Sequence, residues 1–86
     1  KKTMQEIIIT LKDSTTGREV DVELPAEIPI SDLLPAITHE LGIDYAEQRH
    51  LQNKTQLFDY NENDTLASRG TQEYDMCILK YETIQG

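Results

Sequence analysis

Two stretches near the start of the chain read as β-strands, and the second shows their two-residue period. Residues 7–12 read IIITLK, and residues 19–24 alternate Val20, Val22 and Leu24 with acidic residues, as in a sheet with one face in water. Residues 13–18 between them are turn formers, and Gly17 can take a positive φ. The pattern predicts a β-hairpin.

A helical pattern follows the hairpin. Pro25 and Pro29 end the strand, because proline disfavours helical geometry in the residue before it. Ser31 is a favourable N-cap, and Pro35 falls early enough to remove at most one hydrogen bond. Gly42 stands where a left-handed C-cap is expected. We predict a helix of about three turns with one apolar stripe, formed by Leu33, Leu34, Ile37 and Leu41.

The second half of the chain is more polar and less regular. We predict short strands at residues 49–53 and 56–58 joined through Lys54 and Thr55, turns over 59–70, and a last strand at 76–81. This order predicts an α+β β-grasp fold, a mixed sheet of four to five strands with one helix on one face. Its first and last strands lie side by side in parallel. The expected domain spans residues 7–81, between a flexible segment at 1–6 and a tail at 82–86.

Length, net charge and hydropathy exclude several classes of function. A chain of 86 residues supports one small core and is too short for most enzyme scaffolds. Its net charge of -8 argues against binding to nucleic acid or to an anionic membrane surface. No apolar run approaches the roughly 20 residues that span a bilayer, and the start lacks the apolar region of a secretory signal. We therefore expect a cytoplasmic protein without direct membrane insertion; because the chain begins with Lys1, a domain of a longer protein is an alternative.

Two stretches carry a family resemblance. Residues 24–34 read LPAEIPISDLL and residues 62–66 read ENDTL. They resemble the strand-to-helix entry and the turn before the last strand in ubiquitin-like proteins of the YukD/EsaB type, cytoplasmic accessory proteins of type VII secretion in Gram-positive bacteria. The resemblance extends over residues 7–81. Two positions depart from it: Tyr74 precedes Asp75 where the family tends to have glycine, and Thr71 stands where a core aliphatic residue is usual.

The resemblance implies a ubiquitin-like fold and an accessory or regulatory role in type VII secretion, without enzymatic activity. Two alternatives stay open. One is a ubiquitin-like modifier or sulfur carrier activated at its C-terminus, although the chain ends in a lone Gly86 rather than in the Gly-Gly that conjugation requires. The other is a ubiquitin-like domain of a larger membrane component of the same apparatus.

Candidate residues for chemistry are few. Asp59, Asn61 and Asn63 alternate as in a calcium loop, but Asp64 stands at the glycine position and Gly70 at that of the last carboxylate. A solvated turn explains this stretch better. His39 and His50 do not have the spacing of zinc ligands.

Cys77 alternates with Leu79 and Tyr81, and this set predicts core packing rather than a nucleophile. A single cysteine also excludes an intramolecular disulfide. No glycine-rich phosphate loop is present, because the glycines are isolated at 17, 42, 70 and 86. We predict no enzymatic activity, no metal site and no cofactor.

Strand parity predicts one interaction surface. If Ile7, Ile9 and Leu11 face the helix, the alternate residues of the first and last strands face out. The predicted set is Ile8, Thr10, His50, Gln52, Met76 and Ile78. An apolar patch on an acidic domain is typical of a partner site, although aliphatic residues on a wet sheet also satisfy β-propensity alone. The predicted partners are protein components or substrates of the secretion apparatus.

Overall fold

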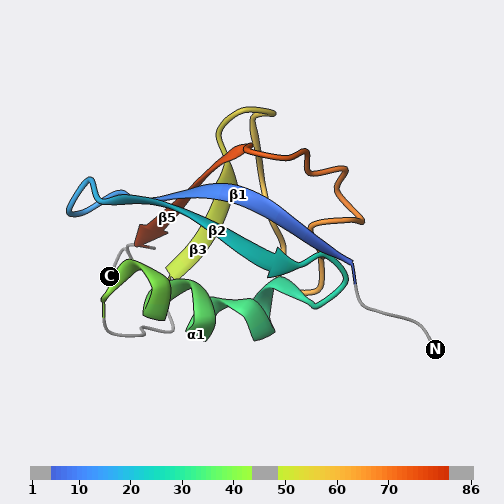
Figure 1. Ribbon diagram of the computed structural model, residues 1–86, viewed down its shortest axis with the longest axis horizontal. Coiled ribbons are helices and arrows are strands. Elements are labelled where there is room, and N and C mark those ends of the chain that lie inside the picture. The colour runs from blue at the N-terminus through green and yellow to red at the C-terminus, as the bar shows by residue number, and fades with distance from the viewer. Residues whose placement is uncertain (1–4, 44–48, 82–86) are drawn as a thin grey trace, which may run out of the picture.

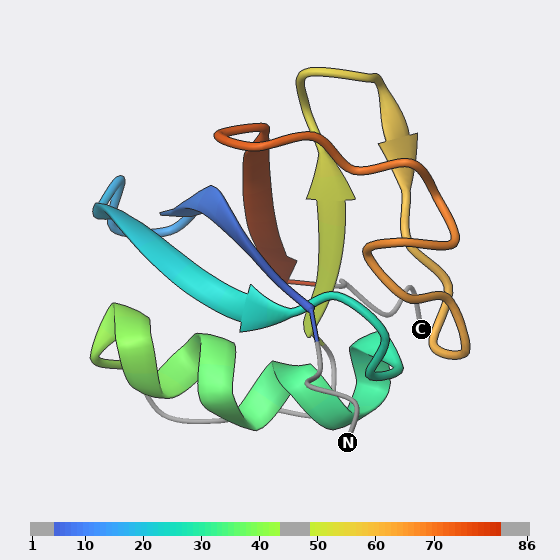
Figure 2. The same cartoon turned by 45° about the vertical axis from the view of Figure 1, so that its right-hand side comes forward.

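The computed structural model describes residues 5–43 and 49–81, which form one mixed sheet and one helix. Of the flexible segment predicted at 1–6, residues 1–4 lie outside the described residues and Glu6 begins the first strand; the tail predicted at 82–86 also lies outside them. The sheet order is β2-β1-β5-β3-β4, with β1 and β5 parallel and the other neighbours antiparallel. The elements are β1 (Glu6–Asp13), β2 (Glu19–Pro25), α1 (Ile30–Leu41), β3 (Arg49–Asn53), β4 (Phe58–Asp59) and β5 (Met76–Tyr81). The helix α1 covers one face of this sheet (Figures 1 and 2), and the predicted β-grasp fold is confirmed.

The hairpin of β1 and β2 follows the predicted alternation. Ile9 pairs with Val22 and Leu11 with Val20, so both strands turn their apolar side chains to the helix. The carboxylate of Asp13 closes the connecting turn, because it accepts hydrogen bonds from the backbone N–H (3.1 Å) and the hydroxyl (2.8 Å) of Thr16. Gly17 takes the positive φ of 78° that the turn requires.

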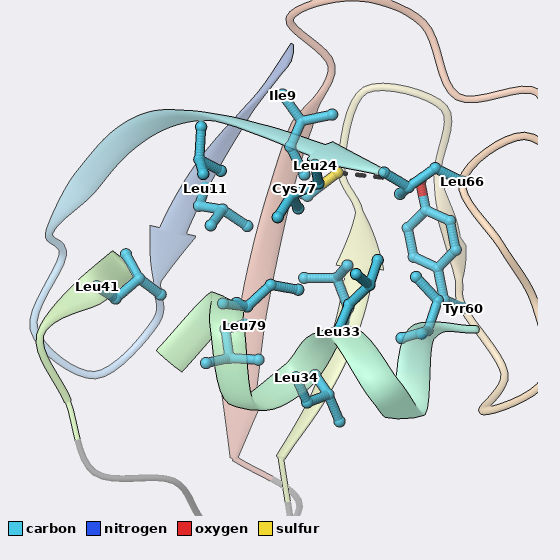
Figure 3. Packing of buried hydrophobic residues seen from close by; sticks show 14 residues of the cluster. Ile9, Leu11, Leu24, Leu33, Leu34, Leu41, Tyr60, Leu66, Cys77 and Leu79 are labelled. Carbon is cyan, nitrogen blue, oxygen red and sulfur yellow. Dashed lines mark hydrogen bonds between the residues drawn. The ribbon is translucent and has the colours of Figure 1, made fainter. Parts of the chain in front are cut away.

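The core lies between this face of the sheet and α1 (Figure 3). The predicted apolar stripe of the helix is buried there, and Ile37 and Leu41 are completely inaccessible to solvent. The sheet contributes fully buried side chains from its central strands: Ile9, Leu11, Leu51, Cys77 and Leu79. The strands that carry this core are therefore β1, β5 and β3.

The start of α1 differs from the prediction. Pro29 occupies the N-cap position without a side-chain hydrogen bond, and the helix already begins at Ile30. Ser31 is therefore not the N-cap, and Pro35 lies beyond the first turn. The N–H groups of Ile30 and Ser31 donate to the carbonyl oxygens of Asp64 (2.8 Å) and Glu62 (3.1 Å). A tertiary contact thus satisfies the helix end that a serine hydroxyl was expected to cap.

This contact joins the two stretches that carry the family resemblance. Residues 24–34 enter the helix, and residues 62–66 supply the carbonyl groups that receive its first N–H groups. Ala67 also donates its N–H to the carbonyl of Ala26 (2.9 Å), and Leu66 is completely buried. At the other end of α1, Gly42 adopts the predicted left-handed C-cap with a φ of 71°.

Two further predictions for the second half are wrong. The strand expected at residues 56–58 is the two-residue β4 (Phe58–Asp59), because residues 54–57 form the turn after β3. Tyr81 was expected in the core and is 56% exposed. Its backbone pairs with Arg49 at the end of β5, and the Arg49 guanidinium lies 4.9 Å from the centre of its ring.

Two exposed residues hold a left-handed backbone without being glycine. Leu57 and Tyr74 both have a φ of 65°. This conformation costs a residue with a Cβ about 1–3 kcal/mol, and glycine adopts it without strain. The backbone at residue 74 is therefore one that glycine would adopt without strain, but this chain places a tyrosine there.

We predict that Tyr74→Gly is more stable than Tyr74→Ala by about 1 kcal/mol, because both variants lose the ring and only glycine relieves the backbone strain. Urea unfolding at neutral pH measures the difference. The same pair of substitutions at Tyr81, which is not among the residues with positive φ, is the control and should favour alanine. Equal stability of the two Tyr74 variants would contradict the assigned strain.

Candidate interaction surface

The predicted patch residues lie on the face of the sheet opposite α1, here called the outer face. Thr10 pairs with Met76 across the parallel β1–β5 contact. Ile78 lies between Lys12 of β1 and Gln52 of β3. Thr10, Gln52, Met76 and Ile78 are all half-buried.

Ile8 and His50 lie at opposite ends of this group. Ile8 precedes the Thr10–Met76 pair by one outward position, and its carbonyl accepts the N–H of Tyr74 (2.7 Å). His50 precedes Gln52 by one outward position on β3 and pairs with Lys80. The structure therefore orders the predicted residues as a diagonal band across β1, β5 and β3. We call this band the outer patch: Ile8, Thr10, Met76, Ile78, Gln52 and His50.

Charged residues border the outer patch on two sides. On β2, Asp21 pairs with Thr10 and accepts a hydrogen bond from its hydroxyl (2.7 Å). On β4, Asp59 pairs with Gln52. Lys12 and Lys80 lie at the same end of the face. A partner that covers the band would thus find aliphatic side chains at its centre and charges at its rim, as in protein–protein interfaces.

A buried polar cluster lies next to the start of β5. The sequence did not predict it. Asn53 is completely buried, and its side-chain N–H groups donate to Asp75 (3.0 Å) and to the hydroxyl of Tyr60 (3.2 Å). The Asp75 carboxylate also accepts from the Gln56 side chain (2.7 Å) and from the backbone N–H of Gln72 (3.0 Å). The cluster therefore joins the turn after β3 to the loop before β5.

These bonds decide the ionisation of Asp75. Burial alone would raise the pKa of its carboxyl group. The donors from Gln72, Asn53 and Gln56 outweigh this effect and hold the pKa below its usual value. The carboxylate is consequently charged at neutral pH and accepts hydrogen bonds from three residues.

Cys77 and Tyr60 are poor candidates for nucleophilic chemistry. Burial raises the pKa of the Cys77 thiol to about 12 and that of the Tyr60 hydroxyl to about 12. The two groups lie 4.0 Å apart, as the dashed line in Figure 3 shows, and the Tyr60 hydroxyl also bonds to that of Thr71. Cys77 is 0% exposed, so its predicted place in the core is confirmed.

The loop that resembled a calcium site is organised around Asp64. Its carboxylate accepts the N–H of Asn61 (2.8 Å) and a guanidinium N–H of Arg69 (2.9 Å), and both bonds lower the pKa of Asp64. The Arg69 guanidinium in turn stacks 4.1 Å from the centre of the Phe58 ring. Within the described ranges no three His, Cys, Asp or Glu side chains gather as metal ligands; His39 is exposed on α1 and His50 lies on β3.

A surface hollow of about 730 Å³ lies between α1, β3 and the residues after β4. Ile30 and Leu34 line it from the helix, Arg49 from β3, and Asp59 and Glu62 from the opposite wall. The wall combines charges of both signs without a cluster of one kind. It does not select a class of small ligand.

The family can be assigned from the sequence over most of this fold. Residues 7–73 match the family model of YukD, described as a protein of the WXG100 protein secretion system (Wss). The chain belongs to the YukD family. The predicted relationship to proteins of type VII secretion is therefore confirmed.

Solved structures show the fold independently. The ubiquitin-like domain of EccD5 from Mycobacterium xenopi is 19% identical with a TM-score of 0.69, over 93% of this chain and 99% of that domain. A protein designed from ubiquitin is 18% identical with a TM-score of 0.75, over 93% of each chain. A chain from a study of SUMO mimicry in DNA repair is 18% identical with a TM-score of 0.75, over 92% of this chain and 95% of that one. No curated protein matches the chain.

Together these findings make the chain a ubiquitin-like module of a secretion-associated family. In the part of the chain that the structure describes, no helix has both the length and the apolar character needed to cross a membrane.

We predict that Asp75→Asn lowers stability at pH 7 by about 1–3 kcal/mol, because a neutral amide accepts the buried hydrogen bonds less well and adds donors without partners. A carboxyl group whose pKa is lowered by folding stabilises the protein above its unfolded pKa of 3.8, and this contribution is lost as the pH falls through the folded value. The decline of stability below about pH 4 should therefore be shallower in the variant than in the original chain.

Urea unfolding between pH 7 and pH 2 measures both effects. Asp59→Asn, at an exposed position of β4, is the matched control with the same chemical change. Because Asp13 and Asp64 also have lowered pKa values, the variant should keep part of the acid dependence. An unchanged acid dependence in Asp75→Asn would contradict the role of this carboxylate.

Proposed function

We propose that this protein is a non-catalytic interaction module that acts in the cytoplasm as an accessory or regulatory component of a type VII secretion system. The outer patch is the surface on which it would hold a protein component or a substrate of the apparatus. The observation that carries the proposal is the strand register, which places Thr10 beside Met76 and Ile78 beside Gln52 on the face opposite the helix.

The shape and chemistry of this face suit a protein partner. A sheet surface is broad, whereas small ligands are usually held in concave pockets. Ile8, Met76 and Ile78 supply aliphatic contact area, and Gln52 and His50 supply polar groups at one end. Such a combination of an apolar centre with a polar rim resembles the anatomy of protein–protein interfaces.

The buried groups support a role without catalysis. Cys77 is the only cysteine of the chain, and burial with a pKa of about 12 keeps its thiol neutral and away from a substrate. The Asp75 carboxylate is engaged with Asn53, Gln56 and Gln72 inside the domain. These groups hold the fold together, which leaves the surface for recognition.

The proposal predicts that Ile8→Thr combined with Ile78→Thr abolishes export of WXG100-type substrates from cells that carry the variant as their only copy. Threonine keeps the β-propensity of isoleucine but removes apolar contact area. Loss of two aliphatic contacts, one at an end and one at the centre of the outer patch, should weaken binding at least about tenfold. Export is measured as the amount of substrate in the medium relative to the amount in the cells.

The matched control combines Leu57→Asn with Tyr81→Thr, which removes exposed apolar side chains outside the outer patch (78% and 56% exposed). This control should export normally. Circular dichroism and urea unfolding show whether each variant is folded. If the threonine pair unfolds, Gln52→Arg tests the same surface by placing a charge beside Ile78. Normal export with folded threonine or arginine variants would overturn the proposal.

A further inference from the structure

The free edge of β2 is a second surface with its own chemistry. β2 (Glu19–Pro25) is the terminal strand on one side of the sheet and pairs only with β1 among the described strands. The other terminal strand, β4, is two residues long. Figures 1 and 2 show β2 at the margin of the sheet, with α1 running beneath it.

The register shows which backbone groups of β2 point away from the sheet. The N–H of Asp13 donates to the carbonyl oxygen of Arg18 (2.9 Å) at the turn, and the N–H of Ala26 donates to the carbonyl oxygen of Gln5 (2.8 Å) at the other end. Residues 13 and 18, and residues 5 and 26, are therefore hydrogen-bonded pairs of the hairpin. Such pairs alternate with non-bonded pairs along an antiparallel ladder. The bonded positions on β2 are therefore Val20, Val22 and Leu24. The N–H and C=O groups of Glu19, Asp21 and Glu23 point outward from the free edge.

The same three residues carry the acidic side chains of the strand. Glu19, Asp21 and Glu23 are exposed and lie on the outer face. Between them Val22 and Leu24 are buried, whereas Val20 is half-buried at the margin of the core. In a strand added to this edge, every second side chain would lie on the outer face beside the carboxylates. The remaining side chains would point to the opposite face, on which Val20 lies.

Charge decides which strand fits. If a second copy paired with β2 in antiparallel register about Asp21, Asp21 would lie opposite Asp21 and each Glu19 opposite Glu23. Like charges directly opposite each other destabilise a sheet, and acidic edges are a common protection against self-pairing. The net charge of -8 adds repulsion between copies. A basic strand meets the same edge with three favourable cross-strand pairs.

We propose that the free edge of β2 accepts an extended segment of a partner protein that has Lys or Arg at every second position and small or β-branched residues between them. The outward N–H and C=O groups of Glu19, Asp21 and Glu23 form the backbone ladder with this segment. The carboxylates pair with its basic side chains. The ladder supplies affinity, and the charge pattern supplies specificity.

This inference does not require the outer patch to bind a partner. The two surfaces are neighbours, because Asp21 accepts the hydroxyl of Thr10. The outer patch uses side chains on a face, whereas β2 uses the backbone of an edge. A single partner could extend over both surfaces, but each can be tested alone.

The probe is the seven-residue peptide Lys-Thr-Lys-Val-Lys-Thr-Lys, acetylated and amidated at its ends, added to the full chain labelled with nitrogen-15. In the free protein, the backbone amides of Val20, Val22 and Leu24 should exchange slowly with solvent, and those of Glu19, Asp21 and Glu23 quickly. At saturating peptide, the exchange of the second set should slow at least about tenfold, because these amides gain backbone partners. Raising the salt concentration to 0.5 M should weaken binding several-fold.

Three peptides control for sequence, charge and backbone. A scrambled peptide with the four Lys residues in one block has the same charge and should protect these amides less. Glu-Thr-Glu-Val-Glu-Thr-Glu should not bind. A version of the probe methylated on the backbone nitrogens that face the edge should lose most of the protection, because it cannot donate to β2.

Variants of β2 separate the two sources of recognition. Glu19→Lys with Glu23→Lys should reverse the preference from the lysine peptide to the glutamate peptide. Glu23→Pro removes an outward N–H without removing a bond to β1, and should weaken binding more than Glu23→Gln, which changes only the charge. Ile78→Thr alone, on β5 and paired with Lys12 and Gln52 rather than with β2, should bind the peptide within about twofold of the original chain, so failure at one surface is distinguishable from failure at the other.

The proposal is overturned if saturating peptide leaves the amides of Glu19, Asp21 and Glu23 unprotected, or if the scrambled peptide protects them equally. It is also overturned if the protein alone dimerises through β2 with protection of the same amides. That result would make a second copy the occupant of the edge.

Discussion

The structure depends on the parallel pairing of β1 with β5. This contact joins residues near the two ends of the chain, with Leu11 opposite Cys77 and Asp13 opposite Leu79. Because these strands are far apart in sequence, bringing them together costs loop-closure entropy before their contact contributes to stability. The same pairing determines the outer patch and the free edge of β2. It places β1 and β5 side by side under the outer patch, and it leaves β2 at the margin of the sheet.

The buried polar cluster explains how β5 reaches the right register. Asn53 and Asp75 each lie next to an end of a strand, and their hydrogen bond fixes the turn after β3 against the loop before β5. Burying these groups is unfavourable unless their hydrogen bonds are satisfied, so a slipped register would leave a charged carboxylate and an amide without partners. The cluster therefore adds to the register preference of the buried apolar face, on which a one-residue slip would already turn Cys77 and Leu79 away from the core.

The elements that hydrophobic periodicity defines were predictable. The alternation at Val20, Val22 and Leu24 and the stripe at Ile37 and Leu41 correspond directly to buried faces in the structure. The strand parity that defines the outer patch follows from the same rule, whereas the register that pairs Thr10 with Met76 comes from the structure. Binding at this patch is still a prediction, because the register shows where residues lie and not what covers them.

The errors arise where tertiary contacts replace local signals. Ser31 has the local chemistry of an N-cap, but the carbonyl oxygens of Glu62 and Asp64 satisfy the helix end. Tyr81 continues the alternation of β5, yet as the last residue of that strand it is 56% exposed. The polar cluster around Asn53 was also missed. The pattern of apolar residues contains no signal for a polar side chain that becomes buried through partners distant in sequence.

The acidic residues have different consequences at the centre of the outer face, from which they are absent, and on β2, where they are concentrated. At the centre of the outer face the side chains are uncharged, so Met76 and Ile78 can be covered without removing a carboxylate from water, which would cost several kcal/mol if it stayed unpaired. On β2 the residues that carry the carboxylates are also those whose backbone N–H and C=O groups point away from β1. A strand that pairs with these backbone groups must therefore also neutralise the carboxylates. Net charge alone would make the whole domain equally repellent to acidic partners. Its placement instead leaves the centre of the sheet open to apolar contact and restricts the edge to basic strands.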